Sequence, residues 1–475
     1  MQSKHIHLIG ICGTAMASLA GMLREQGHTV TGSDTAAYPP MSDQLRAMGI
    51  TIQEPYAAEN LEPAPDLVVV GNAISRGNPE LEHVLDRRIP MTSMAALIHD
   101  EFLLGRDRFV VCGTHGKTTT TSMLSWIFEV ASRIEPRFAP SFLIGGVAEN
   151  FGSSFRVRAQ TRPFVLEGDE YDTAFFDKGP KFLHYFPDAA ILTHVEFDHA
   201  DIYADLDAVK TAFKRMVNLI PARGRLVAYD ASENVTECVS KAFCSVERYG
   251  FREDSFWSLR DLQHENGGSS WTLYRAGKRF ASLTLPMAGE HNALNASAAA
   301  AIAAGHGVSA ESITEALRSF QSVKRRLEVF AEVDGVTMID DFAHHPTAIR
   351  ETLRALRASY PGRRLIAVLE PRSNTLRRNV FEQELVESLS AADEVIVAGV
   401  FNSGAIPEAE RLEPSQVVAA LSQRGTPASL HAQVDEIVAS LAGSVQSGDV
   451  VAILSNGGFG GIYKKLPEAL RETVS

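Results

Sequence analysis

Short apolar runs recur along the whole chain, and most of them end in a glycine or a polar residue. They are rich in valine, isoleucine and leucine without alternating polar positions, which is typical of strands covered on both faces of a parallel sheet. The runs cover residues 5–10, 66–71, 108–113, 164–170, 189–196, 225–229, 336–341, 364–371, 394–400 and 449–458. Helical segments lie between several of them, for example at residues 16–26 and 118–130. Alternating strands and helices predict an α/β fold built from βαβ units.

Residues that can bind ligands stand where these predicted strands end. In open α/β sheets, ligands bind beyond the carboxyl ends of the strands. The residues at those ends are Gly10, Gly71, Gly113, Glu167, His194, Glu196, Asp340, Asp341, Glu370, Ser455 and Asn456. The pattern therefore predicts that the ligand-binding residues lie along one edge of each sheet, at the carboxyl ends of the strands.

The length of 475 residues suggests about three domains at roughly 150 residues each. Breaks are expected near residues 101–108 and near residues 321–328. A polar interval at residues 260–270 predicts a hairpin or a loop inside the second domain. We therefore expect three domains, at residues 1–107, 108–320 and 321–475.

The composition argues against several classes of protein, including nucleic-acid-binding, membrane-spanning and disulfide-rich proteins. The chain has 45 basic and 58 acidic residues and a net charge of −13, which argues against bulk nucleic-acid binding. No apolar stretch approaches the roughly 18 residues of a membrane span, and the first residues do not resemble a signal peptide. The cysteines lack CxxC spacing, so no disulfide framework or zinc site is indicated: Cys12, Cys112, Cys238 and Cys244. A cytoplasmic protein is expected.

The most specific motif lies between a predicted strand and a helix and reads Gly113-Thr114-His115-Gly116-Lys117-Thr118-Thr119. Glycines let backbone N–H groups approach a polyphosphate, and the helix N-terminus adds a positive end. Lys117 can reach the β- and γ-phosphates, and the Thr118 hydroxyl can bind Mg²⁺. Val111 stands where the full phosphate-loop spacing has glycine, so the motif is a shortened variant.

Two groups of polar residues follow the next predicted strands. Glu167 opens a run with four acidic groups in six residues, which suits a hard cation or a solvated loop. His199, in the run at residues 196–201, is either a metal ligand or a structural hydrogen-bonding residue.

A glycine turn follows the first predicted strand. The turn Gly10-Ile11-Cys12-Gly13-Thr14-Ala15 resembles a dinucleotide fingerprint with two substitutions, and Asp34 stands at the expected acidic position. NAD binding is the default interpretation, but a nucleotide-linked sugar would use the same backbone donors. A second nucleotide site at Gly113 favours the sugar, and hence a ligase or kinase over a dehydrogenase.

Four motifs, taken in order, resemble the Mur ligases, which are three-domain amide-forming enzymes. The phosphate loop at residues 113–119 is similar to their ATP loop, and residues 289–295 are similar to their GxHNxxN adenine motif. Arg325 and Arg326 resemble the basic pair that precedes their third domain, and residues 340–347 resemble the DDYxHHPT motif. The resemblance covers the chain and implies a Rossmann-like UDP-binding domain, a central P-loop-type ATPase with a mostly parallel sheet, and a Rossmann-like C-terminal domain.

Two branches of this family use UDP-N-acetylmuramate as the acceptor. One adds L-alanine, and the other attaches the tripeptide L-alanyl-γ-D-glutamyl-meso-diaminopimelate during peptidoglycan recycling. The loops at residues 10–16, 167–177, 196–203, 370–375 and 455–461 depart from the alanine-adding pattern and resemble the tripeptide branch. We therefore expect a tripeptide ligase. The alanine ligase is the alternative, and a regulator that binds a nucleotide sugar without catalysis is a remote one.

The resemblance implies a reaction in two steps. ATP first phosphorylates the lactyl carboxylate of UDP-N-acetylmuramate to an acyl phosphate, and the peptide amine then displaces phosphate. Lys117 would stabilise the transferred phosphoryl group, Thr118 and Glu167 would hold Mg²⁺, and His199 would ligate a second Mg²⁺. His344 would lie near the reacting phosphoryl group or have a structural role.

The resemblance also implies residues for each substrate. ATP would contact residues 113–119 together with Asn292, Asn295, Arg326 and Asp341. The UDP part would contact Gly10, Gly13, Thr14, Asp34, Asn72, Ala73 and Ile74. The peptide would contact Arg372, Ser373, Asn374, Ser455, Asn456 and Gly457. Lys214 stands where later-step relatives carry a carbamylated lysine, but it is equally well a helix-surface charge.

Overall fold

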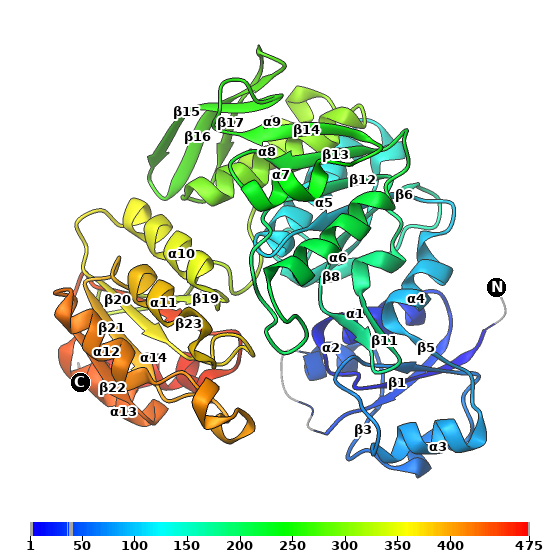
Figure 1. Ribbon diagram of the computed structural model, residues 1–475, viewed down its shortest axis with the longest axis horizontal. Helices are drawn as coiled ribbons and strands as arrows, with labels where there is room; N and C mark the ends of the chain where they lie inside the picture. The colour runs from blue at the N-terminus through cyan, green and yellow to red at the C-terminus, as the bar shows by residue number, and fades with distance from the viewer. Residues whose placement is uncertain (1–2, 36, 38–40, 474–475) are drawn as a thin grey trace.

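Three sheets, each with its own helices, follow one another along the chain (Figure 1). The computed structural model describes residues 3–35, 37 and 41–473. The strands come from residues 5–93 in the first sheet, 107–285 in the second and 328–454 in the third. The α/β fold class expected from the alternation of strands and helices is confirmed.

The first sheet is fully parallel and has the order β3-β2-β1-β4-β5. Its strands are β1 (His5–Ile9), β2 (Thr29–Ser33), β3 (Ile52–Gln53), β4 (Leu67–Val70) and β5 (Met91–Ser93). The helices are α1 (Thr14–Glu25), α2 (Met41–Ala47), α3 (Pro79–Arg87) and α4 (Met94–Ile98). The strand order reverses beside β1, so the turn after this strand lies at the switch point where doubly wound sheets bind ligands.

The second sheet has ten strands in the order β17-β16-β15-β14-β13-β12-β6-β9-β7-β8. The strands are β6 (Asp107–Cys112), β7 (Ser141–Ala148), β8 (Ser153–Arg156), β9 (Pro163–Gly168), β12 (Ala189–Leu192), β13 (Arg225–Tyr229), β14 (Ser245–Gly250), β15 (Trp257–Glu265), β16 (Gly268–Arg275) and β17 (Lys278–Leu285). Its centre is parallel, and antiparallel pairs form both ends. The hairpin expected at residues 260–270 is the β15–β16 turn, where Asn266 and Gly267 both have positive φ.

The helices of the second domain are α5 (Lys117–Ser132), α6 (Leu206–Asn218), α7 (Glu233–Val239), α8 (Glu290–Gly305) and α9 (Ala310–Arg318). Residues 292–303 of α8 are buried on every side, and seven of the twelve are alanine. Small side chains let a helix approach its neighbours closely, and α8 packs against α5. This contact places the start of α8 beside the phosphate loop. A short pair, β10 (Asp172–Ala174) and β11 (Asp177–Pro180), follows the acidic run.

The third sheet has the order β18-β19-β23-β20-β21-β22, with β18 antiparallel and the other strands parallel. Its strands are β18 (Glu328–Val333), β19 (Val336–Asp341), β20 (Leu365–Leu369), β21 (Glu394–Ala398), β22 (Ala428–His431) and β23 (Val450–Leu454). The helices are α10 (Pro346–Ser359), α11 (Glu382–Leu389), α12 (Pro414–Gln423), α13 (Val434–Ser444) and α14 (Ile462–Thr473). Within the described residues, no helix is long and apolar enough to cross a membrane.

Candidate active site

The phosphate loop lies between β6 and α5, as the sequence predicts. Gly113 and Gly116 have φ of 130° and 80°, a region that favours glycine. A Cβ atom on Gly113 would collide with the Thr193 hydroxyl, and one on Gly116 would lie 2.7 Å from Oδ1 of Asn295. The loop can therefore hold this shape only with glycine at both positions, and it leads directly into the N-terminus of α5, a place where anions bind readily.

Lys117 opens α5 and forms a buried ion pair with Glu170. Its Nζ lies 2.8 Å from Oε2 of Glu170 and also donates to the carbonyl of Gly113 at 2.8 Å. Burial alone would lower the pKa of Lys117, but the carboxylates of Glu170, Asp169 and Glu167 outweigh it and raise this pKa. The lysine is therefore held as a cation at the place where a polyphosphate would meet the loop.

Thr118 and Glu167 face each other at the carboxyl end of β9. The Thr118 hydroxyl lies 3.0 Å and 3.1 Å from the two oxygens of Glu167, and the N–H of Gly145 donates to the same carboxylate at 3.0 Å. Burial raises the pKa of Glu167, while Lys117 opposes that rise. A hydroxyl and a carboxylate oxygen at this spacing are ligands that Mg²⁺ accepts.

His199 joins the acidic run on the other side of Lys117. Its Nε2 lies 3.3 Å from Oε1 of Glu170. Ligand atoms of Asp169, Glu170 and His199 all lie within 4.8 Å of one another. Burial would lower the pKa of His199, but the bond to Glu170 and the nearby carboxylates raise it to about 9. Glu170 contacts both Lys117 and His199, although the sequence marked it only as one of the four acidic groups of this run.

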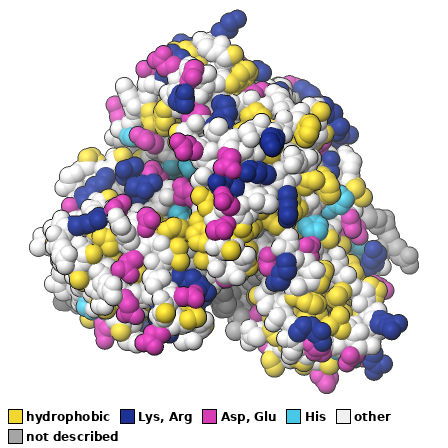
Figure 2. Space-filling model, in the orientation of Figure 1, with side chains coloured by type: hydrophobic (Ala, Val, Ile, Leu, Met, Phe, Trp, Pro, Cys, Tyr) yellow, Lys and Arg dark blue, Asp and Glu magenta, His cyan; other side chains and the backbone are white. Residues whose placement is uncertain are grey.

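A pocket of about 440 Å³ joins all three domains beside this cluster. Figure 2 shows histidine and acidic side chains gathered in the hollow between the central and third domains. Seven residues predicted from the sequence line the pocket, namely Asn72, His199, His344, Arg372, Ser373, Asn374 and Asn456. Tyr171, Asp198, Thr375, Arg377, Phe401 and Asn402 complete the lining. Four of the six residues assigned to the peptide thus share one space with His199 and His344.

The third-domain side of this pocket is built from two strand ends. The Arg372 guanidinium stacks 3.7 Å from the centre of the Phe401 ring and lies 3.3 Å from Oε1 of Glu370. Gly457 lies beneath this guanidinium, since a Cβ atom there would collide with it. Oδ1 of Asn456 is buried and has no hydrogen-bond partner among the described residues. It is therefore an unpaired acceptor in the wall of the pocket.

Ser455 differs from its predicted place at the peptide. It is fully buried, and its hydroxyl donates to Glu370 while accepting from the N–H of Gly457 at 3.0 Å. Because both hydrogen-bonding capacities are used inside the fold, Ser455 shapes the Asn456–Gly457 turn and does not face the pocket.

His344 lies in the pocket with its Nδ1 2.8 Å from the carbonyl oxygen of Phe342. Burial lowers the pKa of His344, so the ring is neutral near pH 7. The bond to the carbonyl requires the proton on Nδ1, which leaves Nε2 as an acceptor.

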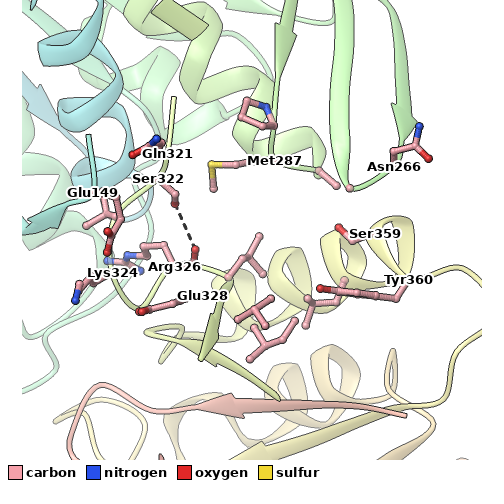
Figure 3. A pocket seen from close by; sticks show the side chains of 18 residues that line it. Glu149, Asn266, Met287, Gln321, Ser322, Lys324, Arg326, Glu328, Ser359 and Tyr360 are labelled. Atoms are coloured by element: carbon pink, nitrogen blue, oxygen red, sulfur yellow. Dashed lines mark hydrogen bonds between the residues drawn. The ribbon is translucent and has the colours of Figure 1, made fainter. Parts of the chain in front are cut away.

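A second cleft, of about 620 Å³, separates the central domain from the third (Figure 3). Met287 projects into it from the central domain, while Arg326 and Tyr360 lie on the third-domain side. The Asn292 amide, buried in α8, donates to the carbonyl of Ala288 at 2.8 Å, and Ala288 lines the cleft. Arg326 is therefore placed between the central and third domains, as expected of a residue that contacts a shared nucleotide.

Asp341 differs from its predicted contact with ATP. It is 4% exposed, and its carboxylate accepts from the N–H of Leu327 at 2.8 Å, the N–H of Ala343 at 2.9 Å and the Thr352 hydroxyl at 3.0 Å. In this arrangement both oxygens are engaged within the protein, and the side chain fixes the segment that carries Arg326.

Glu196 links the phosphate loop to the third domain. Its Oε2 lies 3.0 Å from Nε2 of His115 and accepts from the Thr347 hydroxyl at 2.7 Å. His345 Nδ1 is 3.7 Å away from the same oxygen. The sequence placed Glu196 at a strand end but gave no sign of its partners, because Thr347 lies 151 residues further along the chain.

The first-domain turn is ordered by Asp34. The carboxylate accepts from the N–H of Cys12 at 2.9 Å, and Gly10 has φ of 83°. Ile74 is 6% exposed and packs against Gly10. The other predicted residues are exposed and lie at the same end of the sheet, namely Gly13, Thr14, Asn72 and Ala73.

Comparison with known proteins matches each domain in turn. The family described as "Mur ligase family, catalytic domain" matches residues 5–102, "Mur ligase middle domain" matches residues 111–303, and "Mur ligase, glutamate ligase domain" matches residues 325–457.

Two relatives are named UDP-N-acetylmuramate–L-alanyl-γ-D-glutamyl-meso-2,6-diaminoheptandioate ligase. The one from Escherichia coli is 43% identical, with 98% of both chains covered, and the one from Haemophilus influenzae is 42% identical, covering 98% of this chain and 99% of that one. A crystal structure of a murein peptide ligase from Psychrobacter arcticus superposes with a TM-score of 0.74 at 36% identity, covering 98% of this chain and 99% of that one. This chain therefore belongs to the Mur ligase family.

Proposed function

We propose that this protein is an ATP-dependent ligase that joins UDP-N-acetylmuramate to the tripeptide L-alanyl-γ-D-glutamyl-meso-diaminopimelate. The observation that carries this is a single pocket lined by all three domains, with Lys117 and its carboxylates beside it. A reaction between a nucleotide sugar, ATP and a peptide requires one site that all three substrates can reach. The product would return a recovered peptide to cell-wall synthesis in the cytoplasm.

Sequence similarity supports the tripeptide as the amine substrate. The two relatives whose names specify this tripeptide are 42% and 43% identical to the chain. A relative named UDP-N-acetylmuramate–L-alanine ligase, from Caldanaerobacter subterraneus, is 32% identical over 99% of this chain and 98% of its own. The stronger likeness favours the tripeptide over free L-alanine.

Some residues of the site would bind the substrates, and others would stabilise the charge that develops during the reaction. The phosphate loop and the Lys117 ammonium would bind the β- and γ-phosphates of ATP, and the ammonium would stabilise the phosphoryl group as it moves to the lactyl carboxylate. The cleft lined by Met287, Arg326 and Tyr360 would take the adenosine. Neutral His344, with Nε2 free to accept, would lie near the reacting groups and could take the proton from the attacking amine.

The donor set of the cluster fits Mg²⁺. Thr118 and Glu167 would hold one ion. His199 would hold a second ion, with Glu170 and Asp169 close to it. Oxygen ligands dominate both groups, as this hard cation prefers. When bound, Mg²⁺ would neutralise the charge of the phosphates and of the acyl phosphate.

The tripeptide would lie against the third domain. It carries several carboxylates, to which Arg372 and Asn374 can donate, and the unpaired oxygen of Asn456 can accept from an N–H group of the peptide. Arginine can bind a carboxylate through two parallel hydrogen bonds. The uridine diphosphate would sit at the Gly10 turn, with Asn72 reaching from the first domain to the shared pocket.

A phosphate-release assay tests this proposal. The protein is given ATP, Mg²⁺ and UDP-N-acetylmuramate, together with either the tripeptide or L-alanine. We expect rapid phosphate release with the tripeptide and little with L-alanine. Equal rates would favour the alanine ligase, and no release with either would favour a binding protein without catalysis.

A further inference from the structure

A cavity of about 570 Å³ lies at the edge of the central sheet away from the candidate active site. Asp107, Ala189 and Arg225, the first residues of β6, β12 and β13, line it. The phosphate loop follows the opposite end of β6. Because β6 has six residues at about 3.3 Å each, the cavity lies roughly 20 Å from that loop. No residue assigned to a substrate above lines this space.

Arginines dominate the lining of this cavity. Five of them come from three separate segments of the chain, namely Arg106, Arg108, Arg162, Arg223 and Arg225, against two aspartates, Asp107 and Asp188. In a protein with a net charge of −13, such a local excess of cations is opposite to the overall balance. A concave site lined by one sign of charge attracts ligands of the other sign.

The aspartates leave part of this positive charge uncompensated. Asp188 is shared between Nε of Arg108 at 3.1 Å and Nη2 of Arg223 at 3.2 Å. Asp107 pairs with Arg162 at 2.7 Å, and Arg225 pairs with Glu247, which lies outside the lining of the cavity. Arg106 has no carboxylate within 4.0 Å among residues 3–35, 37 and 41–473, and it donates only to the backbone carbonyls of residues 158 and 161.

Burial of the Arg106 guanidinium also favours the binding of an anion. Arg106 is half-buried, and burial lowers its pKa, because a guanidinium loses hydration there. Gly305, at the end of α8, lets the Arg225 side chain lie against the helix, since a Cβ atom would come within 2.7 Å of its guanidinium carbon. The Arg223 side chain, in contrast, is 79% exposed, and its ion pair with Asp188 is therefore well hydrated and can exchange for a bound anion.

We propose that this arginine-lined cavity is a binding site for a small phosphorylated anion, separate from the active site. Guanidinium groups match phosphate oxygens with paired hydrogen bonds, so several arginines from different segments suit a ligand with two phosphates. The volume lies within the roughly 300–1,000 Å³ of small-molecule sites. Arg106 belongs to the segment that joins the first domain to β6, so a bound anion would tie that segment to the central domain.

The probe for this site is inorganic pyrophosphate, titrated without Mg²⁺ into the full-length protein. Calorimetry counts the binding sites in the wild type, in Arg223→Gln and in Arg106→Gln/Arg223→Gln. Arg279→Gln is the matched control, because Arg279 is exposed on β17 and its guanidinium donates to the Ser282 hydroxyl at 2.7 Å. Thermal unfolding checks that each variant folds. Hydrogen–deuterium exchange with and without pyrophosphate locates the binding.

We expect the double variant to bind one pyrophosphate fewer than the wild type, with Arg223→Gln weakened at least fivefold at that site and Arg279→Gln unchanged. The amides of residues 104–109 and 222–225 should gain protection in the wild type and not in the double variant. Equal stoichiometry and affinity in the wild type and the double variant, with no protection of these segments, would overturn the proposal. The arginines would then serve only to neutralise Asp107, Asp188, Glu247 and the carbonyl end of α8.

Discussion

Lys117 and Glu170 form an ion pair, 2.8 Å apart, at the start of the helix that follows the phosphate loop. The lysine side chain is 12% exposed and the glutamate side chain 2% exposed, so neither charge is well hydrated. A γ-phosphate that enters the loop can take the place of Glu170 as the partner of Lys117. Glu170 would then be left beside Asp169 and His199, where a cation can bind it. The pair thus keeps both groups charged and in position before substrates arrive.

The first prediction concerns this lysine. Lys117→Ala should lower kcat by roughly 10³-fold, because it removes the cation that stabilises the transferred phosphoryl group. The affinity for UDP-N-acetylmuramate, measured by calorimetry, should change less than about twofold, because the Gly10 turn lies in another domain. Lys278→Ala, an exposed position on β17, serves as the control. A Lys117→Ala variant with near-normal turnover would show that the phosphate loop is assigned incorrectly.

A second prediction concerns the pH dependence of stability. Burial would raise the pKa of Glu196, but hydrogen bonds from His115 and Thr347 and the nearby His345 outweigh it and lower this pKa. A carboxylate whose pKa is lowered by folding stabilises the protein above its unfolded pKa of about 4.3, and this contribution is lost as the pH falls. The wild type should therefore lose more stability between about pH 5 and pH 3 than Glu196→Gln does, because the loss begins near the unfolded pKa and continues below it.

Urea unfolding at the two pH values measures this difference. Glu387→Gln, at an exposed glutamate of α11 in a surface ion pair, should follow the wild type. If Glu196→Gln and the wild type lose stability in parallel, the contact between Glu196 and the third domain does not contribute in solution.

Recognition of the peptide gives a third prediction. Arg372→Ala should raise KM for the tripeptide by roughly 10- to 100-fold, as expected for the loss of a charge-assisted hydrogen bond, with KM for ATP nearly unchanged. Arg372→Lys keeps the charge but loses the paired hydrogen bonds of a guanidinium and its contact with Phe401. Its KM for the tripeptide should therefore lie between those of the wild type and Arg372→Ala. Initial-rate kinetics with each substrate varied in turn gives the answer. A rise in KM for ATP instead would place Arg372 at the nucleotide.

The apolar runs were sufficient to predict the centre of every sheet. All ten runs contain strands, because central parallel strands are buried on both faces and carry an uninterrupted apolar signal. Strands at the sheet edges, such as β16 and β17, alternate buried and exposed residues or are short, and the runs did not reveal them. The close approach of helix α8 to the phosphate loop left no pattern in the sequence.

Candidate site residues were predicted where a motif has its own local chemistry. The Gly113–Thr119 loop, Glu167 and His199 lie together because they follow neighbouring parallel strands. Ser455 and Asp341 also follow strands, yet their side chains serve internal hydrogen bonds, and a position at a strand end does not distinguish the two uses. Contacts between domains, such as that of Glu196 with Thr347, depend on how the domains are placed and leave no local pattern.

The central claim is that the tripeptide is the amine substrate, and a competition reaction tests it most directly. Equal concentrations of the tripeptide and L-alanine are supplied in one tube with ATP, Mg²⁺ and UDP-N-acetylmuramate, and mass spectrometry quantifies both possible products. The account predicts that UDP-N-acetylmuramoyl-tripeptide forms in at least tenfold excess. UDP-N-acetylmuramoyl-L-alanine as the main product would contradict it.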